Sequence, residues 1–126
     1  MSEMRIARVF NAHDFTGRAV MDPYQPRLAQ TERARVVEYL ENGKIVLSTT
    51  GRDTDQVNPD RGEVVPMNFL TDGDWVWSEA LPYYVAMYGY APEPEFLDHM
   101  KARNYRLPPS VSDDRIRAAS AKVLGR

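Results

Sequence analysis

The segment from Ala80 to Pro92, ALPYYVAMYGYAP, constrains the fold most, because its thirteen residues carry no charge. Helical spacing divides its large side chains into two apolar stripes, one of Leu81, Tyr84, Val85 and Tyr88 and one of Tyr83, Met87 and Tyr90. One stripe can pack against a sheet, and the other must then be covered by another part of the chain. The segment therefore predicts a helix, starting near Glu79 and stopped by Gly89, with neighbours on two sides.

Short strands surround this helix. The β-branched and aromatic stretches are 44–49, 63–70 and 75–77, joined by a long polar loop at 50–62 and a TDGD turn at 71–74. This order predicts an antiparallel meander, and Pro66 places its strand at an edge or a bulge. Residues 4–9 suit an edge strand, whereas 11–27 is predicted to be irregular because glycine and proline interrupt it.

Three further helices are expected, and glycines follow two of them. Their ranges are 29–42, stopped by Gly43, 94–104, and the segment from Ser112 to Gly125. The sequence therefore predicts a single α+β domain over residues 1–126, with a small antiparallel sheet of three or four strands covered by about four helices.

Composition indicates a globular protein of a reducing compartment. Apolar residues make up 43% of the chain, charged residues 27%, and cysteine is absent. No apolar run approaches the roughly 20 residues that span a bilayer, and the start shows no signal-peptide pattern. We therefore expect a cytoplasmic protein with no membrane partner.

Charge is unevenly distributed along the chain. Residues 51–79 hold seven acids and two arginines, a local charge of −5, whereas the remaining residues sum to +3. An acidic segment repels phosphate backbones and suits a basic protein partner. We expect no nucleic-acid partner.

Metal and cofactor sites are not predicted. Asp53, Asp55 and Asp60 are oxygen ligands at close spacing, but a calcium loop counted from Asp53 would have Asn58 where glycine is required and Val64 where glutamate is required. These acids suit a solvated loop better.

Histidine chemistry is equally unsupported by spacing. A zinc site would need both His13 and His99 with a carboxylate drawn from Asp14, Glu95 or Asp98, and Glu95 and His99 already form an ordinary helix pair. No nucleophile elbow, phosphate loop or dinucleotide fingerprint occurs. We assign no catalytic residue, no metal ligand and no cofactor.

The uncharged aromatic segment allows two interpretations. It can be a central helix whose tyrosine hydroxyls reach the surface, or Tyr83, Met87 and Tyr90 can form an exposed aromatic patch together with Trp77. Aromatic residues of this kind anchor protein interfaces.

The stretch TDGDWVWSEALPYYVAMYGYAPEPEFLDHM resembles small bacterial proteins associated with polymorphic-toxin loci. The resemblance spans about residues 36–107 and is carried by Thr71, Asp72, Gly73, Trp75, Trp77, Tyr83 and Tyr84. It implies an immunity-type role, in which a small protein binds a toxin's enzymatic domain and blocks it.

The function predicted from the sequence is therefore that of a non-enzymatic protein-binding module of the immunity or inhibitor type. Its predicted partner-binding residues are Asp53, Asp55, Asp60, Asp72, Trp77, Tyr83, Met87 and Tyr90. One alternative is a small enzyme that uses Asp53, Asp55 or Asp72 as a base or metal ligand. Another is a module that stacks a flat small ligand on the aromatic segment. The oligomeric state stays open.

Overall fold

The computed structural model describes residues 3–10, 12–13, 15–16, 19–20 and 24–126. The helices are α1 (Gln30–Glu41), α2 (Ala80–Tyr88), α3 (Pro94–Ala102) and α4 (Asp113–Val123), with a short 3-10 turn η1 at Pro59–Arg61. The strands are β1 (Arg5–Ile6), β2 (Ala12–His13), β3 (Ala19–Val20), β4 (Lys44–Leu47), β5 (Arg52–Thr54), β6 (Glu63–Pro66), β7 (Phe69–Thr71) and β8 (Trp75–Ser78).

The main sheet has the strand order β1-β8-β7-β4. β4, β7 and β8 pair antiparallel, which confirms the predicted meander, and Leu70 lies opposite Trp77 in its register. The edge strand expected near the N-terminus is present as β1, but it pairs parallel to β8, with Arg5 opposite Trp75. The sheet is therefore mixed, and the chain has the small α+β fold that the sequence predicts.

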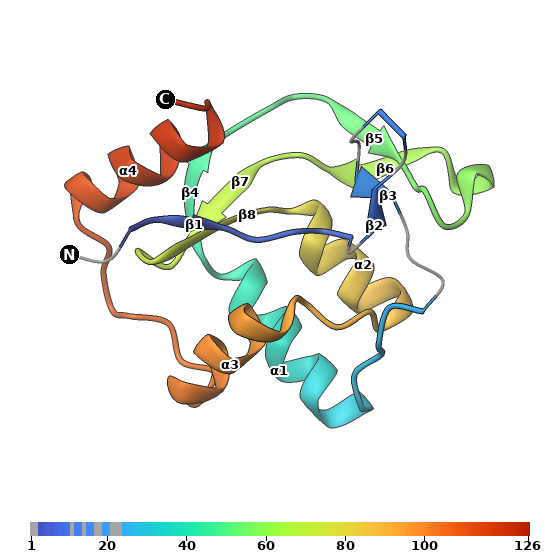
Figure 1. The fold of residues 1–126 in the computed structure, drawn as a ribbon, viewed down its shortest axis with the longest axis horizontal. Helices are drawn as coiled ribbons and strands as arrows, with labels where there is room; N and C mark the ends of the chain where they lie inside the picture. The colour runs from blue at the N-terminus through green and yellow to red at the C-terminus, as the bar shows by residue number, and fades with distance from the viewer. Residues whose placement is uncertain (1–2, 11, 14, 17–18, 21–23) are drawn as a thin grey trace.

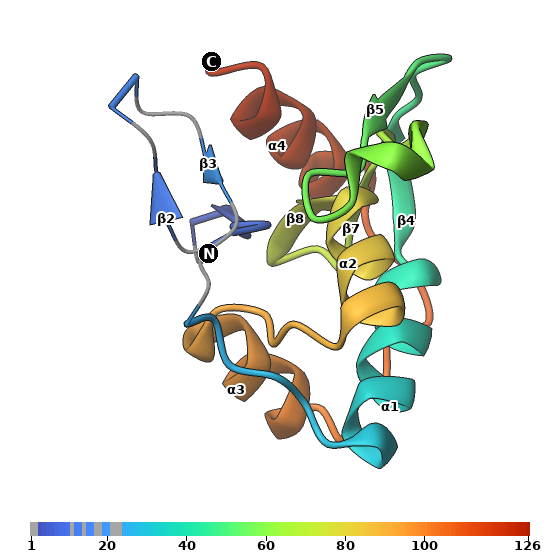
Figure 2. The same cartoon turned by 90° about the vertical axis from the view of Figure 1, so that its right-hand side faces the viewer.

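Helices cover both faces of this sheet (Figures 1 and 2). α4 packs on one face against β1, β4 and β8, whereas α1 and α3 lie beyond the other face and α2 packs beside α1. The alternation of β8 follows these two layers: Val76 belongs to the cluster under α4, and Trp75 and Trp77 belong to the larger core on the opposite side.

The two tryptophans form the centre of the larger core. Trp75 is 4% exposed and stacks on Phe96 with ring centroids 4.6 Å apart, and Trp77 is fully buried, as expected for one face of a strand. The Trp77 indole N–H donates to the Leu40 carbonyl at 3.0 Å. A Cβ atom on Gly43 would lie 2.5 Å from the Trp77 ring, so only glycine allows α1 to turn into β4 at this point.

Three local expectations were wrong. The polar loop at 50–62 contains β5, which pairs with β6 into a hairpin. The stretch 63–70 is divided into β6 and the start of β7, and β2 and β3 pair within the range predicted to be irregular. Pro66 does lie in an edge strand as predicted, since β6 pairs with β5 alone among the described strands.

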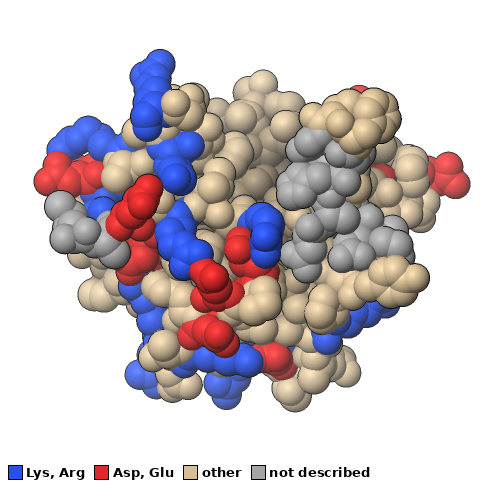
Figure 3. Space-filling model, viewed as in Figure 1, with Lys and Arg blue, Asp and Glu red and all other residues tan. Residues whose placement is uncertain are grey.

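The surface in Figure 3 carries interspersed charges of both signs. Part of this pattern comes from ion pairs that connect the start of α3 to β1 and to the residues just after β1. Arg5 pairs with Glu95, and Arg8 pairs with Glu93 at 3.5 Å while its amide donates to the same carboxylate at 2.8 Å. These contacts tie the N-terminal segment to the body of the protein.

Candidate functional site

The turn between β7 and β8 carries the most elaborate polar site of the described chain. Asp72 opens the turn, and its Oδ1 accepts the backbone amides of Asp74 at 2.9 Å and Trp75 at 2.8 Å. Gly73 has a φ of 99°, which is unfavourable for any side chain. The Thr71 hydroxyl donates to the Trp75 carbonyl at 2.6 Å and accepts the Gly73 amide at 3.0 Å. The TDGD sequence thus builds a rigid turn with a buried carboxylate.

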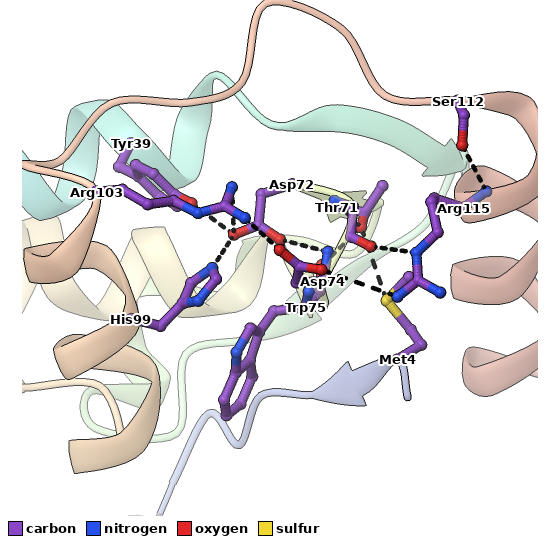
Figure 4. A network of polar contacts seen from close by, with 11 residues as sticks. Met4, Tyr39, Thr71, Asp72, Asp74, Trp75, His99, Arg103, Ser112 and Arg115 are labelled. Atoms are coloured by element: carbon purple, nitrogen blue, oxygen red, sulfur yellow. Dashed lines mark hydrogen bonds and ion pairs between the residues drawn. The ribbon is translucent and has the colours of Figure 1, made fainter. Parts of the chain in front are cut away.

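The second oxygen of Asp72 joins two helices (Figure 4). Its Oδ2 accepts the Tyr39 hydroxyl of α1 at 2.5 Å and lies 2.9 Å from His99 Nε2 of α3. The Arg103 guanidinium lies 3.9 Å from the same oxygen. The Asp72 side chain has no exposed surface, whereas 21% of the His99 side chain is exposed. The turn is therefore bonded to both α1 and α3.

These contacts keep Asp72 ionised. Burial alone would raise the pKa of its carboxyl, but hydrogen bonds from Tyr39, from the amides of Trp75 and Asp74, and from His99 outweigh burial and lower the pKa below its usual range. Burial, followed by the hydrogen bond to Asp72, raises the pKa of Tyr39 far above its usual value. The Tyr39 hydroxyl therefore stays protonated near neutral pH and donates its hydrogen bond to Asp72.

A second acid, Asp74, is bound by two arginines. Arg103 forms an ion pair with Asp74, and Arg115 of α4 lies 4.0 Å from its other oxygen. Arg115 also donates to the Gly73 carbonyl at 2.6 Å. Two carboxylates and two guanidiniums therefore balance in formal charge around the turn, and α4 is bonded to it as well.

Asp72, Asp74 and His99 could offer three ligand atoms within 4.8 Å of one another to a metal ion. The chemistry of this donor set fits a cation poorly. Both oxygens of Asp72 are already hydrogen-bonded, and Asp74 is paired with the Arg103 guanidinium. A divalent ion would have to displace these bonds beside two fixed positive charges.

Hollows of moderate size adjoin the turn. One of about 420 Å³ lies between β4 and residues 107–111, and one of about 340 Å³ lies between the turn and the start of α4. Asp72 contributes to the lining of both, but all of its acceptor positions point to bonded partners. The arrangement therefore orients His99 and joins three helices to the sheet, and it leaves Asp72 no free lone pair for a substrate proton.

A second buried carboxylate, Asp55, lies in the β5–β6 hairpin. Its Oδ1 accepts the amides of Val57 at 2.8 Å and Asn58 at 2.9 Å, and its Oδ2 accepts the hydroxyls of Tyr83 and Tyr88, each at 2.7 Å. Burial alone would raise the pKa of the Asp55 carboxyl, but these hydrogen bonds outweigh burial, so the pKa is lowered. Burial, followed by the hydrogen bond to Asp55, raises the pKa of Tyr88 to about 12. Asp55 therefore holds the hairpin on α2.

The predicted partner-binding residues fall into an exposed group and a buried group. Asp53 and Asp60 are exposed, Tyr83 is half-buried and Met87 is 38% exposed, whereas Asp55, Asp72, Trp77 and Tyr90 are buried. The exposed aromatic patch is therefore wrong for Trp77 and Tyr90, because Trp77 fills the core under α1 and Tyr90 packs with Phe10 and Tyr84. The central-helix interpretation describes α2 better, with tyrosine hydroxyls that reach Asp55 and the hairpin.

Sequence reasoning missed most of the partners of Asp72 and Asp74. Tyr39 belongs to α1, Arg103 follows α3 and Arg115 belongs to α4, and no spacing relates them to the TDGD turn. The sequence offered Asp14, Glu95 or Asp98 as the carboxylate that could share a zinc ion with His99. In the structure the carboxylate beside His99 is Asp72. The side chains of His13 and Asp14 lie outside the described residues.

Comparisons with protein-family models, with curated proteins and with solved structures find no match for this chain. None of the described helices combines the length and apolar character needed to cross a membrane.

Proposed function

We propose that this chain is a non-enzymatic protein-binding module that uses the β5–β6 hairpin, residues 52–66, as its main contact surface for a basic protein. An immunity-type role, in which that protein is a toxin's enzymatic domain, follows from the sequence resemblance. The observation that carries the proposal is the way the hairpin is held. The buried Asp55 fastens the hairpin to α2, while other acids of the hairpin are exposed to solvent.

The hairpin extends away from the main sheet (Figures 1 and 2). The Asp55 carboxylate binds it to two tyrosines of α2, and the amide of Gln56 donates to the Tyr84 hydroxyl at 2.9 Å. Val65 is 1% exposed and packs with Phe10 and Tyr84. A loop held in this way loses little conformational entropy on binding, which favours affinity.

On the hairpin, three exposed acids outnumber two exposed arginines, Arg52 and Arg61. Asp53, Asp60 and Glu63 are exposed, and acidic atoms mark the hairpin tip at the right edge of Figure 3. Arg61 lies 3.7 Å from Asp55 Oδ2 and donates to the Tyr83 hydroxyl at 3.3 Å, so the buried Asp55 partly neutralises its charge although 42% of the Arg61 side chain is exposed. Exposed acids of this kind speed encounter with a basic surface.

Two partly exposed methionines offer apolar contact area, one next to the hairpin and one on the helix that holds it. Met87 lies one helical turn after Tyr83 and is 38% exposed, and Met67, just after β6, is 40% exposed. Flexible thioether side chains adapt to a partner's surface. The proposed surface thus combines an acidic part that steers the partner with an apolar part that holds it.

The test uses the full chain and the protein encoded by the neighbouring reading frame as the immobilised partner in surface plasmon resonance. We expect the variant D53N/D60N/E63Q to associate about tenfold more slowly at low salt, with dissociation nearly unchanged. Met87→Ala should instead speed dissociation.

The matched control is E41Q/D98N/D113N, which neutralises three exposed acids outside the hairpin. It should reduce the association rate much less than the hairpin variant. Equal rates for the two triple variants would place the contact surface elsewhere. A neighbouring protein that does not bind the unmodified chain would count against the immunity-type role.

A further inference from the structure

A polar cleft lies between α1 and the turn that follows α3, and it shares no residue with the hairpin surface. Its volume is about 680 Å³, within the range of small-molecule sites. Its lining consists of Arg35, Glu38, Tyr39, Asn42, Asn104, Tyr105, Arg106 and Leu107. Tyr39 is the buried residue among them, and its hydroxyl is occupied by Asp72.

Two guanidiniums in this cleft are free to bind. Within the described part of the chain, neither Arg35 nor Arg106 uses its guanidinium in a hydrogen bond or ion pair. Arg35 lies over the Tyr105 ring, 5.6 Å from its centroid, an arrangement that leaves the edge of the guanidinium available. Arginine presents this edge to phosphates and carboxylates as paired donors.

The turn that carries Arg106 is held in an unfavourable conformation. Asn104 and Tyr105 have φ angles of 54° and 57°, and they are the described non-glycine residues with positive φ. Asparagine is common at this position after a helix, and the Tyr105 amide closes the turn on the Met100 carbonyl at 2.9 Å. An aromatic residue is uncommon there.

Contacts of the Tyr105 side chain maintain this conformation. Its hydroxyl donates to Glu32 of α1 at 2.6 Å, and its ring packs against the main core. Glu32 also lies 3.6 Å from Lys101. Backbone strain held by surrounding contacts is frequent at binding sites, and here it positions Asn104 and Arg106 against α1.

We propose that this cleft binds a small organic anion whose phosphate or carboxylate group lies between Arg35 and Arg106. The amide group of Asn104 supplies a further donor. Glu38 is exposed in the same cleft and accepts hydrogen bonds from donors next to the anionic group, which selects a hydroxylated or amino-bearing ligand over a bare anion. The site is independent of the proposed protein contact.

The test is a titration of the full chain followed by two-dimensional NMR of amide and side-chain N–H signals. The probes are glycerol 3-phosphate, glycerate, inorganic phosphate and acetate, each against a chloride background of equal ionic strength. We expect saturable shifts at Arg35, Asn104 and Arg106, with a Kd of about 1 mM or lower for one of the two hydroxylated probes. Comparing glycerol 3-phosphate with glycerate decides between phosphate and carboxylate.

Two double variants of equal charge separate a site from general electrostatics. R35Q/R106Q should weaken binding at least about tenfold, whereas R8Q/R117Q, which removes two exposed arginines elsewhere, should change it less than about twofold. Glu38→Gln should weaken binding of the hydroxylated probe but not of the bare anion. Equal weakening by both double variants, an unaltered Kd in R35Q/R106Q, or shifts that do not saturate would each overturn the proposal.

Discussion

The environments of Asp72 and Asp55 have the same bonding pattern in two different parts of the molecule. Each aspartate accepts the amides two and three residues further on with Oδ1, and each accepts two side-chain partners with Oδ2. Each also has an arginine nearby, Arg103 at 3.9 Å and Arg61 at 3.7 Å. Hydrogen bonds lower the pKa of both carboxyls in spite of burial.

The two sites differ in what their partners connect. Asp72 reaches Tyr39 of α1 and His99 of α3, so that it joins the central turn to both helices. Both tyrosines bound to Asp55 come from α2, so that it fastens one hairpin to one helix. The same local motif thus supports the whole fold in one place and a projecting surface in the other. We expect the consequences of removing each carboxylate to differ accordingly.

The largest effect is expected from Asp72→Ala. This change leaves the Tyr39 hydroxyl, two backbone amides and the His99 ring without their acceptor, and it should lower the free energy of unfolding by about 3 to 5 kcal/mol. Urea titration followed by tryptophan fluorescence measures it. Asp74→Ala is the control and should cost clearly less, since 37% of the Asp74 side chain is exposed. Equal losses would show that Asp72 has no central role.

A smaller and local effect is expected from Asp55→Ala. The loss should be about 1 to 3 kcal/mol, because two tyrosine hydroxyls and two amides lose a partner near the surface. Hydrogen exchange should speed up in residues 52–66 while β7 and β8 stay protected. Loss of protection in the main sheet as well would make Asp55 a global contact and remove the contrast with Asp72.

Acid should destabilise the protein through both carboxyls. A folded-state pKa below the unfolded value means that the stabilisation is complete above the unfolded pKa of about 3.9 and is lost as the pH falls through the folded pKa. Thermal unfolding between about pH 7 and pH 2 measures this dependence. Asp72→Asn and Asp55→Asn should each flatten the curve below about pH 4. A curve unchanged by both substitutions would contradict the lowered pKa values.

The smallest effect is expected from divalent ions. Since the oxygens of Asp72 and Asp74 are occupied by protein donors, added zinc, calcium or magnesium should leave the melting temperature unchanged. A bound ion at about 100 times its Kd would instead stabilise the protein by about 2.7 kcal/mol. A rise that a chelator reverses, and that His99→Ala abolishes, would show that the turn does bind a metal.

The main sheet and helices follow from local patterns in the sequence. The uncharged aromatic segment became α2, and the alternation of Trp75, Val76 and Trp77 placed two rings in one core and one side chain under α4. Gly43 and Gly89 end α1 and α2 where the helical pattern stops. The alternation and the ends of the helices depend on neighbours in the chain, so spacing predicts them, whereas the need for glycine at position 43 depends on the distant Trp77 ring.

The parallel pairing of β1 and the contacts of Asp72 were not predictable in this way. β1 contributes two residues, and its partner β8 lies 70 positions further on. The exposure of the predicted surface also depended on packing, because Trp77 and Tyr90 have the residue types of an interface but fill the interior. Composition does not distinguish an aromatic anchor from a core residue.

The sequence by itself determined the fold class, most of the helices, the meander and the acidic character of residues 51–79. The tertiary structure decided which acids are buried: Asp55 and Asp72 are enclosed, while Asp53 and Asp60 face outward. It also decided that Arg35 and Arg106, 71 positions apart, share one cleft. The physical reason is that periodicity follows from local backbone geometry, whereas the partners of a buried charge are brought together only when separate elements pack.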